Sequence, residues 1–446
     1  MLVLVHATAT GAAHAQTPAD TARRPAPDSL SADSLAARLA RAEAAIALLR
    51  QQMAEESETA ARTRSRARLE FSARLLANGF WTSARVNNVD VPQVASPPVA
   101  GGGGVLGATV RQSRVGAVAV IPEVLGGTFD AGIDVDFFGG VQNGAGDRRL
   151  FPEPRLRTAR GRLIWARTEV LVGSETPLVS DLDPISVASV GTPNFSGAGN
   201  LWNWLAQVRV TREVTDSGAP VRIALQGAVL APFAGAQVAG EPDAVDAAER
   251  SRRPFLEARV RGRWGAAAAE HDLPALTELV DGGGEVGVGV HHGWVDIGGG
   301  VLRASRAFTV DARVALAPGV ELRGEGYAGG QLLRGLGGGG IGQAFGRAAA
   351  GAPPGALGPP LRDAAGWAQL NVQPHPVLMG GAGCGIDGVR AADRAVRQRN
   401  AVCAAHVAWR PVQPLLVGFE WRRLRTRYDA GAFVAHHLNL AFGVEL

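Results

Sequence analysis

The last residues of the chain alternate between apolar and polar positions. From Ala435 to Leu446, the apolar positions of one parity are Leu438, Leu440, Phe442, Val444 and Leu446. The other parity includes His437, Asn439 and Glu445. Successive side chains of a strand point to opposite faces, so the pattern predicts a strand with one apolar face. Its length suits a tilted membrane-spanning strand of about 9 to 11 residues, although a soluble sandwich can end on the same pattern.

The same alternation recurs upstream, where the polar face carries charges. Between Thr128 and Phe138 the polar parity includes Asp130, Asp134 and Asp136, and between Phe255 and Trp264 it includes Glu257, Arg259, Arg261 and Arg263. The segments at 207–211 and 221–229 follow the same rule. No helices are predicted to cover the apolar faces. Strands that are apolar on one face and charged on the other are typical of a membrane barrel, with lipid outside and water inside.

Connections of two lengths separate the predicted strands. Short ones lie at Pro122–Gly126, Asp216–Ala219, Ala317–Gly319, Gln373–His375 and Pro411–Pro414. Long ones, rich in Gly and Pro, lie at Trp81–Gly104, Ser174–Leu201, Ala231–Arg253, Arg334–Arg362 and Asp387–Arg399. Short turns on one rim and long loops on the other are typical of an outer-membrane barrel. If Gly265–Gly284 is one connection, the prediction is an antiparallel up-and-down barrel of sixteen strands; the alternative is a further strand around Ala266–Ala269.

A different organisation is predicted before the barrel. We expect a signal peptide at 1–15, a linker at 16–29, a coiled-coil helix at 30–58, an Arg-rich linker at 59–68 and the transmembrane β-barrel at 69–446. A short apolar run, Leu2–Val5, and the small residues Ala13 and Ala15 indicate export. The helix has a heptad seam of Leu35, Leu39, Ala42, Ile46, Leu49 and Met53, which predicts a short periplasmic coiled coil between protomers. A single amphipathic helix is the alternative, and the seam does not distinguish two strands from three.

Composition excludes several classes of function. The 446 residues are 46% hydrophobic, yet no run of about 18 apolar residues exists to form a membrane helix. All 45 basic residues are Arg, which excludes a Walker-type phosphate loop and a lysine Schiff base. A net charge of +4 gives nucleic-acid binding no support.

The string from Gly383 to Gly388 matches a dinucleotide fingerprint without a surrounding βαβ unit, so we expect no cofactor. No metal-ligand spacing is present, and no Ser and His pair indicates an outer-membrane lipase, so we expect no enzyme.

Three segments, with the predicted coiled coil before them, resemble the early strands of DcaP-type outer-membrane porins. They are Arg111–Val120, Gly127–Gly140 and Arg155–Pro177. The resemblance implies a trimeric sixteen-stranded barrel in outer-membrane lipid. It also implies passage of small anionic solutes, dicarboxylates among them, through an arginine-bearing constriction. Two departures concern the stretch Ser174–Pro177, where the family tends to carry a Gln-Thr-Trp-like stretch, and Leu446, which replaces a terminal aromatic residue.

Arginines are the candidate pore-lining residues, because their planar guanidinium binds carboxylates bidentately and stays charged at any working pH. Strand parity selects Arg114, Arg157, Arg209, Arg222, Arg259, Arg261, Arg263 and Arg323. Position in the resembling strands selects Arg111, Arg114, Arg155 and Arg157. The alternative is that many of these arginines pair across the lumen with carboxylates such as Asp134, Asp136, Glu257, Glu321 and Glu325.

The long segment Ser174–Leu201 is the candidate constriction loop. Its candidate residues are Glu175, Asp181, Asp183 and Asn194, whose acids would oppose the arginine wall. An ordinary exposed loop is the alternative. Cys384 and Cys403 lie at the predicted tops of adjacent strands, where a disulfide would brace the loop between them; two buried thiols are the alternative.

These patterns together predict a homotrimeric outer-membrane porin for passive diffusion of small anionic solutes, with no nucleic-acid partner. The alternative function is a closed or plugged barrel with a structural or surface-adhesion role. An outer-membrane enzyme has less support than either.

Overall fold

The computed structural model describes residues 67–139, 147–236, 245–265, 279, 282–352 and 356–446. The predicted signal peptide, the linker at 16–29 and the coiled-coil helix lie outside the described residues. The first strand begins at Arg68, the last residue that the sequence assigns to the Arg-rich linker.

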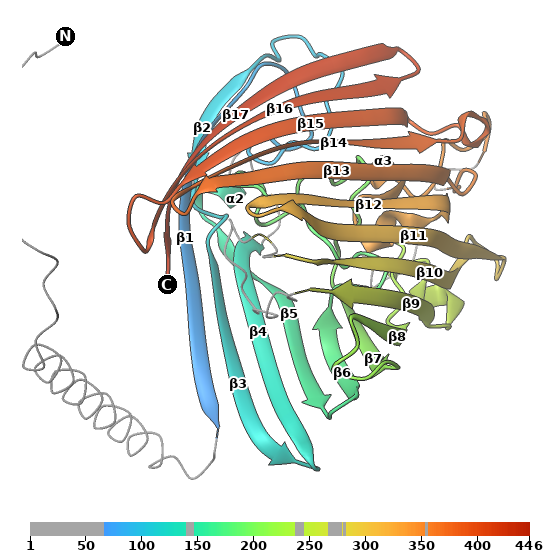
Figure 1. Ribbon diagram of the computed structural model, residues 1–446. Coiled ribbons are helices and arrows are strands. Elements are labelled where there is room, and N and C mark those ends of the chain that lie inside the picture. The colour runs from blue at the N-terminus through green and yellow to red at the C-terminus, as the bar shows by residue number, and fades with distance from the viewer. Residues whose placement is uncertain (1–66, 140–146, 237–244, 266–278, 280–281, 353–355) are drawn as a thin grey trace, which may run out of the picture. The chain divides into compact units, whose positions relative to one another are not determined.

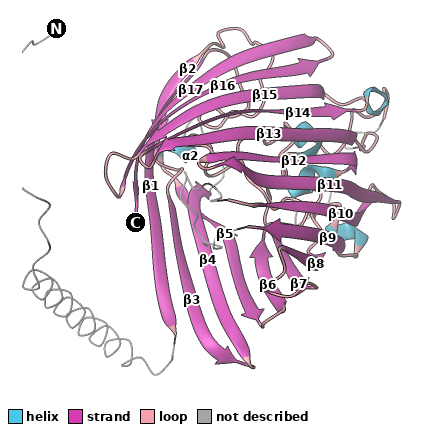
Figure 2. Cartoon of the chain, in the orientation of Figure 1, coloured by secondary structure: helices cyan, strands magenta, loops and turns pink. Residues whose placement is uncertain are grey.

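Seventeen strand segments make up most of the described chain (Figure 2). The first nine are β1 (Arg68–Thr82), β2 (Val105–Thr109), β3 (Arg114–Val124), β4 (Gly127–Gly139), β5 (Glu153–Ile164), β6 (Thr168–Glu175), β7 (Leu205–Glu213), β8 (Val221–Leu230) and β9 (Phe255–Trp264). The others are β10 (Gly284–Asp296), β11 (Leu302–Ala317), β12 (Val320–Gln331), β13 (Arg362–His375), β14 (Leu378–Val389), β15 (Arg397–Trp409), β16 (Leu415–Tyr428) and β17 (Gly431–Glu445). Short helical turns lie in the connections: α2 (Asp147–Leu150), η1 (Glu249–Ser251), η2 (Leu333–Leu336), α3 (Gly339–Gly342) and η3 (Ala391–Asp393).

The strands close into an antiparallel barrel with sixteen strand positions. Strands β2 and β3 share one position, because both pair with β1, at Asn78–Thr82 and at Arg68–Arg74 respectively. The last strand, β17, pairs with β1 from Glu445 opposite Arg74 to His437 opposite Thr82, and closes the barrel (Figure 1). Strands β9 and β10 pair directly, so the segment between them is one connection. The predicted sixteen-stranded barrel is confirmed.

The two faces of the strands follow the predicted parity. In β17 the side chains of Ala435, His437, Asn439 and Ala441 are buried in the interior, whereas Leu440 and Phe442 are exposed on the outside. Apolar side chains are exposed on the outside of most strands, as a lipid-facing surface requires. Among the described residues, no helix has the length and apolar character needed to cross a membrane.

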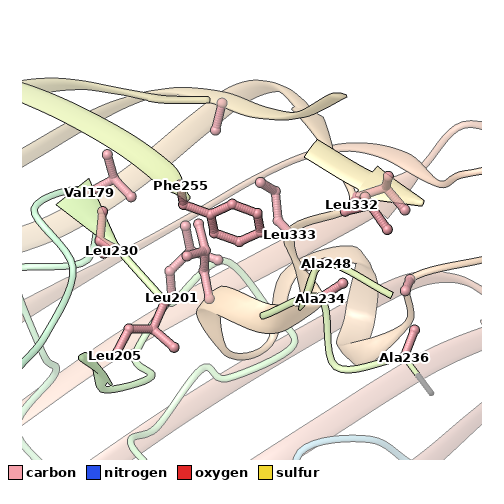
Figure 3. Close-up of a cluster of buried hydrophobic side chains, with 14 of the residues drawn as sticks. Val179, Leu201, Leu205, Leu230, Ala234, Ala236, Ala248, Phe255, Leu332 and Leu333 are labelled. Atoms are coloured by element: carbon pink, nitrogen blue, oxygen red, sulfur yellow. The ribbon is translucent and has the colours of Figure 1, made fainter. Parts of the chain in front are cut away.

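The long connections gather at one end of the barrel, as predicted, although 297–301 and 429–430 at that end are short and 265–283 at the other end is long. We call the end bearing the connections 83–104, 176–204, 231–254 and 332–361 the long-loop rim, and the opposite end the short-turn rim. The long connections fold into the barrel and form hydrophobic cores inside it. The largest of these cores is shown in Figure 3, where Leu201, Leu332 and Leu333 of the connections pack with Leu230 and Phe255 of the wall.

A β-bulge interrupts the parity of β5. Asp134 of β4 lies opposite Thr158, but the next residue, Val135, lies opposite Leu156, so Arg157 is the extra residue. Such a bulge shifts the strand by one residue, which changes the face of every position beyond it. Arg160 and Arg162 therefore point inward, although alternation from Arg155 and Arg157 assigns them outward.

Cys384 and Cys403 form a disulfide between β14 and β15. They lie directly opposite each other in the middle of the two strands, on the outer face. The predicted position at the tops of the strands, bracing the loop, is therefore wrong. The parity of Cys384 matches that of the exposed Ile386, which is why the pair faces outward.

Candidate functional site

The connection 176–204 lies inside the barrel and is held by polar side chains of the wall. Gln369 of β13 accepts from the Ile185 amide and donates to its carbonyl, each at 2.8 Å. Glu420 of β16 accepts from the Val187 amide at 3.0 Å and from the Ser186 hydroxyl at 2.7 Å. These contacts satisfy backbone groups that would otherwise be buried without partners.

Gln112, between β2 and β3, completes this anchor. Its amide oxygen accepts from the backbone of Val190 and Gly191, each at 2.9 Å, and its amide nitrogen donates to the Ala188 carbonyl at 2.7 Å. The interruption between β2 and β3 therefore places a side chain where it holds the loop. The anchors of the loop therefore lie on β13, on β16 and on the segment between β2 and β3.

Asp181 and Asp183 differ from the rest of this loop because they are exposed within the barrel, whereas residues 184–191 are buried. Desolvation inside the barrel opposes ionisation of Asp181, but Arg259, Arg209 and Arg261 together lower its pKa. For Asp183 desolvation prevails over the attraction of Arg157, and its pKa is raised. The tip of the loop thus presents two carboxylates with different proton affinities to the solvent of the interior.

The four arginines chosen by resemblance are all paired with aspartates. Arg111 binds Asp90 and lies 4.1 Å from the centre of the Phe138 ring, so it fastens the connection 83–104. The other three form a network on β3, β4 and β5: Arg114 binds Asp134, Arg155 binds Asp136, and Arg157 contacts both aspartates at 3.2 and 3.1 Å. The charges of this network are largely balanced.

A second group of arginines, on β7, β8 and β9, has far fewer carboxylates. Arg222, Arg261 and Arg263 share the single carboxylate of Glu213, at 3.4, 3.6 and 3.0 Å. Arg209 donates to Gln207 and to the Thr176 carbonyl, and has no carboxylate partner among the described residues. This side of the interior therefore carries excess positive charge.

Arg259 connects the positive side to an acidic one. Its guanidinium binds Asp181 of the loop, Glu285 of β10 and Asp311 of β11. Farther along the wall Arg323 binds Glu321 and donates to the Asp183 carbonyl at 3.1 Å. Basic residues of β7–β9 thus lie beside carboxylates of the adjacent strands β10–β12, and the loop tip is bound where the two groups meet.

Two of the four predicted loop residues lie elsewhere than expected. Glu175 is the last residue of β6 and binds Arg160. Asn194 is buried and donates to Glu420, so it supports the loop and does not face the interior solvent. The sequence analysis did not select Glu213, although it lies at the same strand parity as the inward Arg209 and could have been assigned inward on that basis. It also did not select Arg160 and Arg162, which the β-bulge turns inward.

A pocket of about 380 Å³ lies between the long connections. Its lining includes Asn88, Trp202, Asn203, Arg334 and Arg397, and no carboxylate. Arg397 donates to the carbonyls of Ile341 and Gly342, at 3.0 and 3.3 Å. This pocket is therefore lined by two arginines and by no acidic side chain.

Comparison of the fold with solved structures gives a clear relation. The outer-membrane channel DcaP of Acinetobacter baumannii matches with a TM-score of 0.63 and 13% identity, over 85% of this chain and 97% of that chain. The barrel resembles DcaP. An anion-selective porin from Comamonas acidovorans matches with a TM-score of 0.51 and 10% identity, over 85% of this chain and all of that chain. No family model and no curated protein matches the sequence. At these identities the DcaP match establishes a shared fold.

Proposed function

We propose that this protein is an outer-membrane porin for passive diffusion of small anionic solutes, including dicarboxylate-like ones. The observation that carries the proposal is a group of inward arginines with few carboxylates: Arg222, Arg261 and Arg263 share Glu213, and Arg209 beside them donates to Gln207 and to the Thr176 carbonyl. Fixed charges along a water-filled bore favour solutes of the opposite sign. Asp181 and Asp183 are exposed at the tip of the inward loop, which indicates that solvent reaches the interior next to these arginines. The fold shared with the outer-membrane channel DcaP supports a channel function.

The proposal includes a homotrimer in the outer membrane, with the coiled-coil helix joining the protomers in the periplasm. Support comes from the heptad seam at 35–53 and from the exposed apolar outer face of the barrel. The short-turn rim, where β1 begins, then faces the periplasm. Deletion of residues 30–58, followed by measurement of oligomer mass in detergent, tests the role of the helix; an unchanged trimer would remove it from assembly.

Planar-bilayer recording tests the transport function. Purified protein is expected to give conductance steps in groups of three, and a salt gradient should give a reversal potential of the sign for anion preference. Cation preference would contradict the arginine-based proposal.

A closed barrel with a structural or adhesive role is the second candidate. The observation that favours it is the hydrophobic core that the long connections build inside the barrel. Under that hypothesis the same recordings show no conductance, and deletion of the inward loop opens the channel.

A further inference from the structure

The outer face of β16 changes in character along the strand. Exposed or partly exposed apolar residues, Leu415, Val417 and Phe419, come first; Trp421 follows; and the exposed Arg423, Arg425 and Arg427 end the strand at the long-loop rim. An outward arginine is most costly at the midplane of a bilayer and costs little near its surface, where aromatic residues are enriched. The surface of the membrane therefore crosses β16 near Trp421, and the three arginines lie at headgroup level.

Neighbouring strands carry arginines at the same rim. Arg399 of β15 lies opposite Arg427 of β16. Arg399 also lines an outer groove of about 600 Å³ with Arg306, Arg362 and Arg390. We call these four residues and the space between them the arginine groove. Its floor contains Gly329, Gly330 and Gly388, which leave the surface hollow because they have no side chains.

Most of the charge of this region is uncompensated. Arg362 binds Asp393, and the carboxylate of Asp363 accepts from the Tyr327 hydroxyl and the Gly340 amide. Among the described residues, the six other outward arginines, Arg306, Arg390, Arg399, Arg423, Arg425 and Arg427, form no ion pair with a carboxylate. Three of these six, Arg306, Arg390 and Arg399, line the groove, and like charges around one hollow repel one another and attract an anion.

We propose that the arginine groove binds the phosphate group of a lipid in the outer leaflet. The guanidinium fork matches a phosphate bidentately, and the level of the groove is that of the headgroups. The acyl chains would lie along the apolar outer surface below, which includes the exposed Ile386 and Leu370. The inference rests on the proposed outer-membrane location and does not require that the barrel conducts.

Titration of the full-length protein with lipid A in a neutral detergent tests the proposal, with bound lipid counted by native mass spectrometry. The test variant is Arg390→Gln with Arg399→Gln. The control is Arg334→Gln with Arg347→Gln. It removes the same charge from the long-loop rim, at positions outside the groove. We expect the groove variant to bind lipid A about tenfold more weakly or worse, and the control to bind as the wild type. Chemically dephosphorylated lipid A should bind the wild type as weakly as the groove variant binds lipid A.

Three results would overturn the proposal: unchanged lipid A binding by the groove variant, equal binding of the dephosphorylated lipid, or displacement of lipid A by an equal concentration of inorganic phosphate, which would indicate a site for free anions. Gel mobility before and after heating establishes that each variant is folded. Bilayer recordings separate this inference from transport, because the groove lies outside the bore. A wild type that binds lipid A without conducting would contradict the porin function alone.

Discussion

The guanidinium of Arg259 on β9 reaches the carboxylate of Asp311 on β11 across the intervening strand, with Nε at 3.1 Å from Oδ2. Gly287 of β10 makes this contact possible, since it lies opposite both Arg261 and Asp311 in the register. A Cβ atom at position 287 would overlap the guanidinium and the carboxylate. The absence of one side chain therefore permits a charge pair that spans three strands and also holds Asp181 of the loop.

Gly287→Ala is expected to destabilise the barrel by roughly 1–3 kcal/mol, because a buried charge pair must shift to make room. The midpoint of the heat-induced change in gel mobility measures this effect. Gly262→Ala on β9 is the control, because nothing lies within 4 Å of a Cβ there. Equal midpoints for the two variants would show that the pair can move without cost.

Arg209→Gln combined with Arg261→Gln is expected to shift the reversal potential toward cations, because both charges lie on the side of the interior that has excess arginine. Salt-gradient recordings in planar bilayers measure the shift. Arg423→Gln with Arg425→Gln removes the same charge from the outer face and should leave the potential near the wild-type value. If the reversal potential shifts more in this control than in the Arg209 and Arg261 variant, the residues that determine ion selectivity lie outside the bore.

Alternation along the strands predicted the architecture and the face of most side chains. It did so in β17 and β4 because side chains alternate between the two faces of a strand. Positions that contact lipid are apolar, and positions that face the interior include the polar residues. It failed at Arg160, since a single extra residue, Arg157, reverses the parity beyond it. No local preference of the sequence marks that bulge.

Pairing between charges was less predictable than their direction. Parity places Arg114 and Arg261 equally inward, yet Arg114 and Arg157 contact Asp134, with Asp136 as a second carboxylate, whereas Arg261 shares the single carboxylate of Glu213 with two other arginines. The difference depends on the register between strands and on how far the long side chains reach. Asn194 shows the same limit, because the path of the loop decides that it meets Glu420.

Anion preference is expected to increase as the pH is lowered. The pKa of Asp183 is raised by desolvation inside the barrel, so this carboxylate gains its proton at a higher pH than an ordinary aspartate and removes a negative charge from the loop tip. The pKa of Asp181 is lowered, so it stays ionised over the same range. Reversal potentials recorded from neutral to mildly acidic pH measure the change. Asp183→Asn should show the stronger anion preference already at neutral pH and a smaller pH response, and Asp216→Asn on the short-turn rim is the control.

Gln112→Ala is expected to loosen the inward loop and to make the conductance larger and noisier. The substitution removes three hydrogen bonds to Ala188, Val190 and Gly191 and leaves buried backbone groups without partners, at a cost of about 1–3 kcal/mol for each group. Single-channel recordings measure both the mean conductance and its fluctuations. Gln373→Ala is the matched control, since this glutamine lies half-buried at the short-turn rim and its side chain donates to the nearby Pro376 carbonyl. Steady current through the Gln112 variant at the wild-type level would show that the remaining bonds, from Gln369 and Glu420, are sufficient to fix the loop.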